Sequence, residues 1–408
     1  MQRKIVKGIF SISILWALWG WLFTETVFAN ATIIYIVLGL LTTLYITGLF
    51  LNIKSIKVNP IVALWIPFVL WRLIAFVRIG NFESATYWLG CFTFLLVASS
   101  YSDDIIFPKK IIEISGSIAI AGILVEMLLP SVYNSFILPL FSDFRISRIE
   151  RWGGSHGGYA GIMCQLDRAA CTIMWLEALV FCSMQSGKNK RKYLFFLIIV
   201  FVILSGKRMA SFVSVFTPLF IWLVAERKMG KQPIAVLVVL SFISLVVLFF
   251  LSNLEFFSNI AGFSRIVEAI GDVKTGESLS GSREELNRMA WAGFNNSPIF
   301  GVGILNYGGG MGASAHNIYL QVLCEQGIVG FILLIIPIVS CLFYTLKRLK
   351  YSNLEKQFIL FFSLFSQFVF ILCGITENAL TDTFLFNFYF LAMALLNIVN
   401  NKSRINEY

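Results

Sequence analysis

Long apolar runs separated by short polar connections make up most of the chain. Each run approaches the ~20 residues that a helix needs to cross a bilayer, so the pattern predicts twelve spanning helices. The runs fall at residues 8–28, 31–51, 60–77, 84–100, 111–130, 168–185, 193–205, 210–225, 233–251, 327–346, 357–375 and 383–398. The predicted fold class is an all-α polytopic integral membrane protein. Residues 1–408 form one membrane domain, with outer loops at 131–167 and 252–326.

Composition supports this class. The chain is 58% hydrophobic and 13% charged, with a mean hydropathy of +0.81, which excludes an ordinary soluble globular domain. The apolar run after the basic start is long enough to be a retained first helix, and no small-residue cleavage pattern ends it. The seven cysteines lie mostly in apolar runs without a CxxC pair, so neither a disulfide framework nor a zinc site is predicted.

Basic residues alternate in density between successive connections. With a cytoplasmic N-terminus, most of the 32 basic residues fall in inside segments, so both termini are expected in the cytoplasm and the protein in the inner membrane. The basic residues left outside need a reason to break this bias. They include Arg145, Arg148, Arg151, Arg168, Lys207, Arg208, Arg283 and Arg288.

The clearest polar element is SGSREELNRMAWAGFNNSP. Ser282 and Glu285 have capping-box spacing, and Pro298 closes the stretch, so an amphipathic helix is predicted between them. Arg283 lies in its first turn, where the helix dipole disfavours a cation by ~0.3–1 kcal/mol, which hints at another role. Arg288 is turned about 140° away at 100° per residue, so one arginine is expected to face the site and the other the surface.

Next comes the glycine-rich run GVGILNYGGGMGASAHN. It lacks both the preceding strand and the spacing of a nucleotide loop, and a flexible turn is the better interpretation. His316 heads a short helix that Gly327 is expected to end. It is either a proton acceptor or phosphate contact, or a packed interfacial residue. The same two interpretations apply to His156.

Lys207 and Arg208 occupy a short connection at the level of the outer leaflet. They either extend to headgroups or bind the diphosphate of a lipid-linked substrate. Arg72 lies within a span, where a charge costs at least ~2.5–3.5 kcal/mol, so pairing with a carboxylate such as Glu126 or Glu177 is expected.

These residues resemble a known family. The chain is similar to bacterial O-antigen polymerases (Wzy-like) and O-antigen ligases, of the polytopic glycosyltransferase C class. The family pattern is a Gly-Arg before a short amphipathic helix, a proline with Gly-x-Gly, a His-Asn pair, and a glutamate with Gly-x-x-Gly. The matching residues here are GSREEL with Arg283, PIFGVG with Pro298, Gly301 and Gly303, His316 and Asn317, and EQGIVG with Glu325, Gly327 and Gly330. SGKRMAS resembles the family's Ser-Arg loop, with its arginine at Arg208.

The resemblance implies a metal-independent, cofactor-free transfer of a glycan from undecaprenyl diphosphate to a sugar hydroxyl at the outer face of the membrane. By the resemblance, Arg208 and Arg283 are expected to bind the diphosphate and His316 to act as general base or phosphate contact. The expected binding residues are Lys207, Arg288, Arg151, Arg168, Asn317 and Glu325. Expected partners are lipid-linked donor and acceptor oligosaccharides and the bilayer, with a chain-length regulator and a flippase as candidates. No nucleic acid is expected.

Three functions stay open. A polymerase of O-antigen, capsule or exopolysaccharide would extend another lipid-linked repeat unit, and is preferred because nothing marks a site for lipid A core. A ligase would use lipid A core or another envelope acceptor. A transporter or flippase would need several ionisable residues within its spans, whereas the arginines here concentrate on one face. That asymmetry favours an enzyme.

Overall fold

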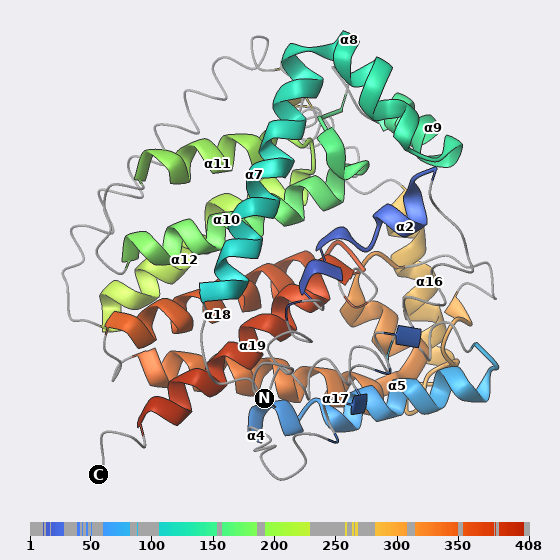
Figure 1. Ribbon diagram of the computed structural model, residues 1–408. Coiled ribbons are helices and arrows are strands. Elements are labelled where there is room, and N and C mark those ends of the chain that lie inside the picture. Colours follow the sequence, from blue (N-terminus) through green and yellow to red (C-terminus); the bar gives the residue numbers. More distant parts are fainter. Residues whose placement is uncertain are drawn as a thin grey trace.

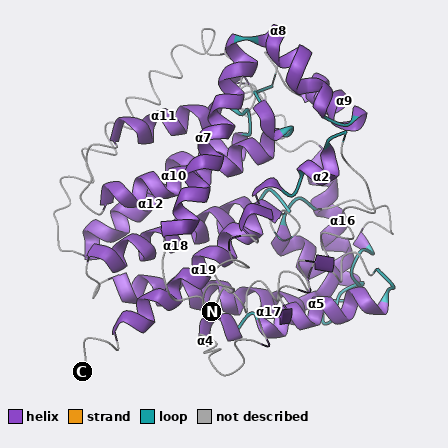
Figure 2. Ribbon diagram, in the orientation of Figure 1, coloured by secondary structure: helices purple, strands orange, loops and turns teal. Residues whose placement is uncertain are grey.

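The computed structural model describes the chain at 18–27, 60–81, 106–152, 157–185, 192–228, 282–307, 315–349, 354–378 and 383–403, with scattered positions elsewhere. Within these ranges the regular elements are helices, and one isolated bridge pairs Thr26 with Phe141 (Figures 1 and 2). The predicted all-helical architecture is therefore confirmed for the described part of the chain.

Eight of the described helical segments coincide with predicted spans. They are α4–α5 (Pro60–Ala63 and Ile66–Arg78), α7 (Ile106–Leu128), α10 (Leu166–Gln185), α11 (Lys192–Leu204), α12 (Arg208–Lys228), α17 (Ile318–Leu349), α18 (Leu354–Cys373) and α19 (Thr383–Ser403). Three of the described helices, α7, α17 and α18, are long and apolar enough to cross a membrane. The predicted spans 31–51, 84–100 and 233–251 lie almost wholly outside the described residues. The structure thus supports an integral membrane protein, and the number twelve stays a prediction.

The predicted outer loop 131–167 is largely helical. It contains α8 (Pro130–Val132), a π-helical turn (Tyr133–Ile137), a 3-10 turn (Leu138–Leu140), α9 (Asp143–Trp152) and a second 3-10 turn (Gly161–Met163). The sequence did not predict these helices, because their apolar positions mix exposed and buried residues and form no continuous span. In Figure 1, α8 and α9 turn away from the end of α7 and lead towards α2 (Leu22–Glu25).

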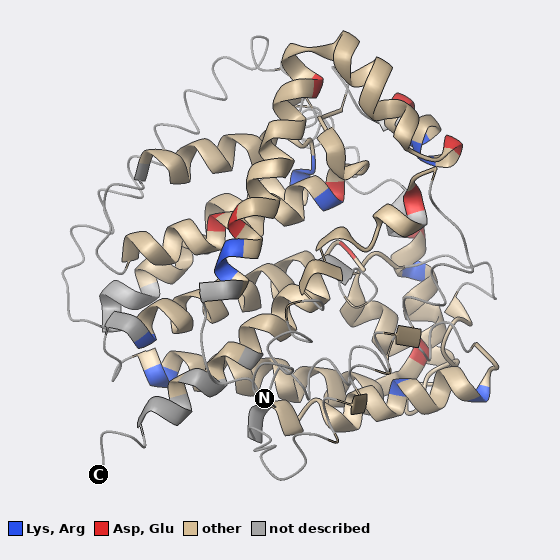
Figure 3. Cartoon of the chain, in the orientation of Figure 1, with Lys and Arg blue, Asp and Glu red and all other residues tan. Residues whose placement is uncertain are grey.

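Helices α10, α18 and α19 form the centre of the bundle, and α10 also packs against α7, α11 and α12. Most of these helices are free of charged side chains along much of their length (Figure 3). Aromatic rings join α4 and α5 to this centre: the Trp65 ring centroid lies 5.5 Å from that of Tyr389 and 5.4 Å from that of Phe390. Interlocked rings of this kind bury large apolar areas and fix helix positions.

Helix α17 is broken at Gly327, whose φ of 62° and ψ of −163° are not helical. The break lies where the helix after His316 was predicted to end. That short helix and the predicted span 327–346 therefore form one helix, α17, which is interrupted at Gly327. Residues 298–303 dock into it: Val302 N–H donates to Cys324 O at 2.9 Å, and Ile328 N–H donates to Pro298 O at 2.8 Å. A Cβ on Gly327 would lie 2.3 Å from Ile299 O, so only glycine fits there.

Helix α16 (Ser282–Asn296) is the predicted amphipathic helix, and it ends before Pro298 as predicted. It packs against the first part of α17 through a small cluster that contains Ala290, Ala315 and Cys324. The Tyr307 hydroxyl donates to Leu286 O and fastens the connection between the two helices. Helix α16 is thereby held beside the start of α17.

Candidate active site

Two glycine-containing turns meet backbone to backbone at the start of α12. Gly206 has a φ of 74°, and a Cβ on it would lie 1.8 Å from Gly157 O. Tyr159 N–H donates to Leu204 O at 2.9 Å across the same contact. The glycines are required because any side chain would push the two turns apart. This contact sets where Lys207 and Arg208 lie.

Lys207 bridges two carboxylates from different elements. Its Nζ lies 2.7 Å from Oδ1 of Asp167, in the first turn of α10, and 3.0 Å from Oε1 of Glu377, in the turn between α18 and α19. Burial alone lowers the pKa of Lys207, but Asp167 and Glu377 outweigh this effect and raise its pKa above the ordinary value. Lys207 is therefore a charged crosslink between α10, α12 and the α18–α19 turn.

Arg208 is the first residue of α12, and its side chain is exposed. Within the described part of the chain, no carboxylate forms an ion pair with it. It follows Lys207 directly, at the N-terminus of α12, where the backbone dipole favours an anion. Of the two neighbouring cations, Arg208 is the one whose charge is available to a ligand.

The α18–α19 turn also positions the start of α17. Ile318 N–H donates to Gly374 O at 2.9 Å, and the Tyr319 hydroxyl donates to Ile371 O at 2.9 Å. Glu377 follows three residues after Gly374 and reaches Lys207. The N-termini of α10, α12 and α17 are thus linked through this one turn.

His316 and Asn317 form the entry to α17. His316 is half-buried and has a φ of 48°, a left-handed conformation that few non-glycine residues adopt. Asn317 accepts hydrogen bonds on Oδ1 from the backbone N–H groups of Tyr319 at 3.0 Å and Leu320 at 3.1 Å. Asn317 is therefore the helix cap, and its side-chain oxygen is already engaged in turning the chain at His316.

The remaining predicted residues divide into two groups. Arg288 is exposed on α16, in agreement with the expectation that one of the two arginines faces outwards. Arg283 lies in the first turn of α16 and Arg151 near the end of α9, but their side chains, and the whole of His156, lie outside the described residues.

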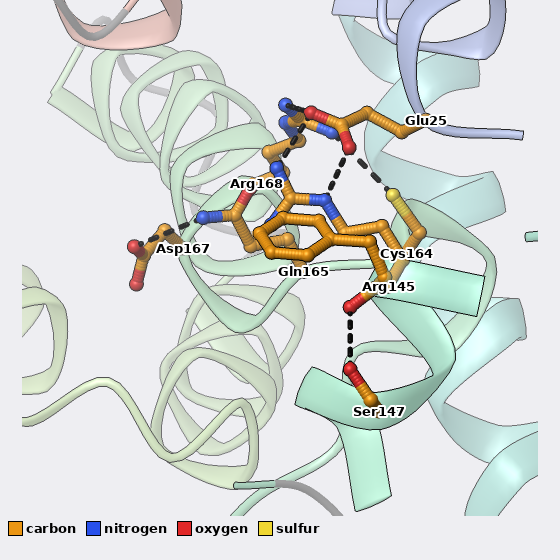
Figure 4. A network of polar contacts seen from close by, with 8 residues as sticks. Glu25, Arg145, Ser147, Cys164, Gln165, Asp167 and Arg168 are labelled. Atoms are coloured by element: carbon orange, nitrogen blue, oxygen red, sulfur yellow. Dashed lines mark hydrogen bonds and ion pairs between the residues drawn. The ribbon is translucent and has the colours of Figure 1, made fainter. Parts of the chain in front are cut away.

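Arg168 belongs to a second ionic cluster, around Glu25. Its Nη2 lies 2.9 Å from Oε1 of Glu25, which also receives Arg145 Nη2 at 2.6 Å. Figure 4 shows Glu25 between the two arginines, with Asp167 directed away from them. The hydrogen bonds that Arg145 donates to Glu25, together with the negative charge of Glu25, raise the pKa of Arg145. Since one carboxylate serves two guanidinium groups, the cluster keeps a net positive charge beside the Lys207 bridge.

Glu325 lies deeper, on α17 next to its break, and is 2% exposed. Its Oε1 accepts from Leu305 N–H at 3.2 Å and from Gln321 Nε2 at 3.2 Å, and its carboxylate interacts electrostatically with Arg72. The predicted partners of Arg72 were wrong: Glu126 accepts from Gly161 N–H at 2.6 Å, and Glu177 from the Ser214 hydroxyl at 2.6 Å. Helix α5 packs on α17, which brings Arg72 to Glu325 instead.

Sequence reasoning missed the three carboxylates Glu25, Asp167 and Glu377. Each lies at the predicted outer end of a span, and that shared position was the available signal. Their partners come from elements far apart in sequence, so spacing could not identify them.

Part of the candidate site lies in a segment that matches a known protein family. Residues 193–335 match the family described as O-Antigen ligase. The segment includes α11, α12, α16 and the first part of α17, and with them Arg208, Arg283 and His316. The match confirms the predicted resemblance to the O-antigen ligase and polymerase superfamily. No curated protein matches the chain.

Proposed function

From the O-antigen ligase match at residues 193–335, we propose that this protein is a membrane polymerase of a surface polysaccharide. The donor is a glycan on undecaprenyl diphosphate, and the acceptor is a sugar hydroxyl of another lipid-linked repeat unit. In the reaction, the acceptor oxygen bonds to the donor sugar's anomeric carbon, and the bond from that carbon to the diphosphate breaks. Undecaprenyl diphosphate leaves, and the hydroxyl proton passes to a base.

One observation carries the proposal: three helix N-termini, of α10, α12 and α17, are linked around the α18–α19 turn with cations beside them. The first N–H groups of α17 are already bound by Asn317 and Gly374, so stabilising the negative charge on a diphosphate leaving group falls to the start of α12 and to guanidinium groups. Arg208 supplies an exposed guanidinium at this point. The Glu25 cluster, with two arginines and one carboxylate, offsets the net negative charge of the Lys207 bridge, and this leaves the charge of Arg208 in excess.

We assign Arg208 and Arg283 to the diphosphate and His316 to the acceptor proton. Position 283 shares the helix face of Ala290 at 100° per residue, and Ala290 packs in one cluster with Ala315, the neighbour of His316. Histidine can accept a proton near neutral pH. Lys207, Asn317 and Glu325 hold their elements in place, while Arg288, Arg151 and Arg168 are left for sugar or lipid contacts.

A ligase would use the same residues with a different acceptor, such as lipid A core or another envelope polymer. The polymerase is preferred because no feature of the described residues marks a site for a second kind of acceptor. A flippase is disfavoured by the family match.

The test is transfer by the purified protein with an undecaprenyl-diphosphate-linked repeat unit, comparing wild type with Arg208→Ala, Arg283→Ala and His316→Ala. A ladder of added repeats that disappears in the variants, while their thermal unfolding matches wild type, supports the polymerase and this site. Transfer of a single glycan to an added lipid or polymer acceptor, without a ladder, replaces the polymerase with a ligase. Movement of substrate across vesicles without any transfer rejects the enzyme.

A further inference from the structure

Large apolar side chains are exposed at every fourth residue from the end of α7 to the start of α9. They are Leu128, Val132, Phe136, Leu140 and Phe144, with exposed fractions between 43% and 71%. A contiguous exposed stripe of this kind marks a contact surface, because water does not solvate it favourably. We call residues 128–152, which carry this apolar stripe, the outer arm.

The outer arm starts where a spanning helix ends. Helix α7 is a candidate membrane span that closes at Leu128, and α8 begins at Pro130. Figure 1 shows the chain turning there, so that α8 and α9 run away from the axis of α7. Leu128 is both the last residue of the candidate span and the first exposed residue of the stripe, so the stripe begins where the span ends.

The other side of the outer arm is fixed to the bundle. Tyr133 is buried and its hydroxyl donates to Gly161 O at 3.3 Å, and Phe141 is buried with its ring centroid 6.4 Å from that of Trp21. Val27 N–H donates to Leu140 O at 2.9 Å, and Arg145 is bound to Glu25. The stripe therefore faces outwards because its opposite face is already occupied by protein.

Charge identifies the occupant. The exposed Arg148 guanidinium lies 4.9 Å from the centroid of the Phe144 ring, the pairing of aromatic body and cation that is typical of a membrane interface. Arg151 follows on the same helix. Helix α9 also exposes Asp143 and Glu150, but Arg148 is the charged residue in line with the stripe, four residues after Phe144, where its guanidinium can bind a lipid phosphate.

We propose that the outer arm is an in-plane membrane element. The apolar stripe lies among the acyl chains of the outer leaflet, and Arg148 binds phosphate groups of anionic phospholipid headgroups. This role goes beyond glycan transfer and does not depend on it. It gives Arg148 a reason to lie outside against the charge bias.

The proposal is tested on the full chain in lipid nanodiscs carrying single nitroxide labels. Cysteines introduced at Phe136 and Leu140 report on the stripe, while those at Asn134 and Ser147, which are also exposed, are the matched controls. Labelled wild type gives the background from the native cysteines. Labels at 136 and 140 should relax preferentially with oxygen, and labels at 134 and 147 with a water-soluble nickel complex. If the nickel complex reaches 136 as readily as 134, the proposal is overturned.

Headgroup binding is tested by exchanging phosphatidylcholine for phosphatidylglycerol in the nanodiscs. The label at 136 should move deeper with the anionic lipid in wild type and in Arg148→Lys, which keeps the charge. The shift should disappear in Arg148→Gln. An equal shift in Arg148→Gln and wild type would reject the phosphate contact. Because Arg148 and Phe136 are exposed, these changes are expected to leave folding intact, which thermal unfolding checks.

Discussion

Lys207 and Arg208 differ in what surrounds their charges. The Lys207 ammonium is held by two carboxylates from separate elements, whereas Arg208 is exposed and meets no ion-pair partner among the described residues. An ammonium that already serves two anions contributes little to a third, and removing it leaves the two carboxylates facing each other without a cation. An exposed guanidinium can bind a phosphate without first breaking a bond in the protein. Lys207 therefore stabilises the fold, and Arg208 is the residue that we propose for the ligand.

Lys207→Met should destabilise the protein by about 1–3 kcal/mol, less than the full loss of a buried pair because the bridge is partly exposed. The triple variant Lys207→Met, Asp167→Asn, Glu377→Gln should recover much of this loss, since no uncompensated charge remains. Thermal unfolding in detergent measures both. If the triple variant is as unstable as the single one, packing rather than charge accounts for the effect.

Arg208→Gln should leave unfolding within about 0.5 kcal/mol of wild type, because the side chain is exposed. The transfer rate should fall by roughly ten- to a hundredfold, the equivalent of one charge-assisted hydrogen bond of about 1.5–3 kcal/mol. Initial rates with the lipid-linked repeat unit provide the measurement, and Arg208→Lys should retain part of the rate. Full activity of Arg208→Gln would remove this residue from the site.

The Lys207 bridge also has a pH dependence. Its carboxylates raise the pKa of Lys207 in the folded protein, so its contribution to stability is complete below the unfolded pKa of about 10.4 and is lost as pH rises through the folded pKa. The stability difference between wild type and the triple variant should therefore stay constant from neutral to mildly basic pH and shrink only in strongly basic solution. Unfolding curves at a series of pH values test this; a loss near pH 8 would contradict it.

At the scale of elements, the site depends on helix starts and on the turns between them. Helices α10, α12 and α17 each contribute their first turn, and the α18–α19 turn connects them. Backbone contact between residues 157–158 and 205–206 sets the start of α12. Because the contact leaves no space for a side chain, the glycines determine the position of Lys207 and Arg208 more strongly than the apolar packing of the helices does.

Gly206→Ala should therefore disturb the site directly. A Cβ would lie 1.8 Å from Gly157 O at a left-handed φ, so we expect a loss of about 2 kcal/mol or more and a large loss of transfer. Gly39→Ala is the matched control, since a Cβ added at Gly39 would meet nothing within 4 Å. Thermal unfolding and transfer rates are compared for the two variants. Equal behaviour would show that the two turns can separate without cost.

The sequence predicted the positions of helices and helix ends better than it predicted contacts between distant residues. Helix α16 and the break at Gly327 followed from local chemistry, a capping box and a glycine, and both lie where they were predicted. The ionic clusters did not follow, because they join residues such as Glu25 and Arg168 that lie 143 positions apart. The outer arm was missed because its apolar positions mix exposed and buried residues and form no continuous span.

At the scale of the whole molecule, residues that the charge pattern assigned to one side of the membrane meet in the folded protein. Glu25, Arg168 and Arg145 form one cluster, and Asp167, Lys207 and Glu377 form the next. These residues come from separate segments of the chain. Residues predicted to lie on the same side of the membrane are thus in contact in the folded protein. Because these contacts join separate segments, they support one shared site on that side instead of several independent ones.

The outer elements are also connected to the interior through Arg72 and Glu325. Arg72 lies on α5 between aromatic rings, with its guanidinium carbon 4.9 Å from the centroid of Trp88, and it interacts electrostatically with Glu325. Glu325 in turn accepts from Leu305 N–H, in the connection that carries α16. A charge inside the bundle thereby contacts, through Glu325, the connection between α16 and α17.

This connection predicts non-additive mutations. Because Arg72 and Glu325 are both buried and interact electrostatically, Arg72→Met and Glu325→Gln should each remove a favourable interaction and destabilise the protein. The double variant should be more stable than the sum of the two predicts, by about 1–3 kcal/mol. A denaturant series in detergent on all four proteins gives the coupling energy. Phe181→Leu combined with Arg72→Met is the control, because Phe181 packs against Phe195 and Phe365 on other helices and is expected to add independently. Additivity of Arg72→Met and Glu325→Gln would mean that the charge within the bundle and the outer connection are energetically separate, and that the position of α16 is set by packing on α17 alone.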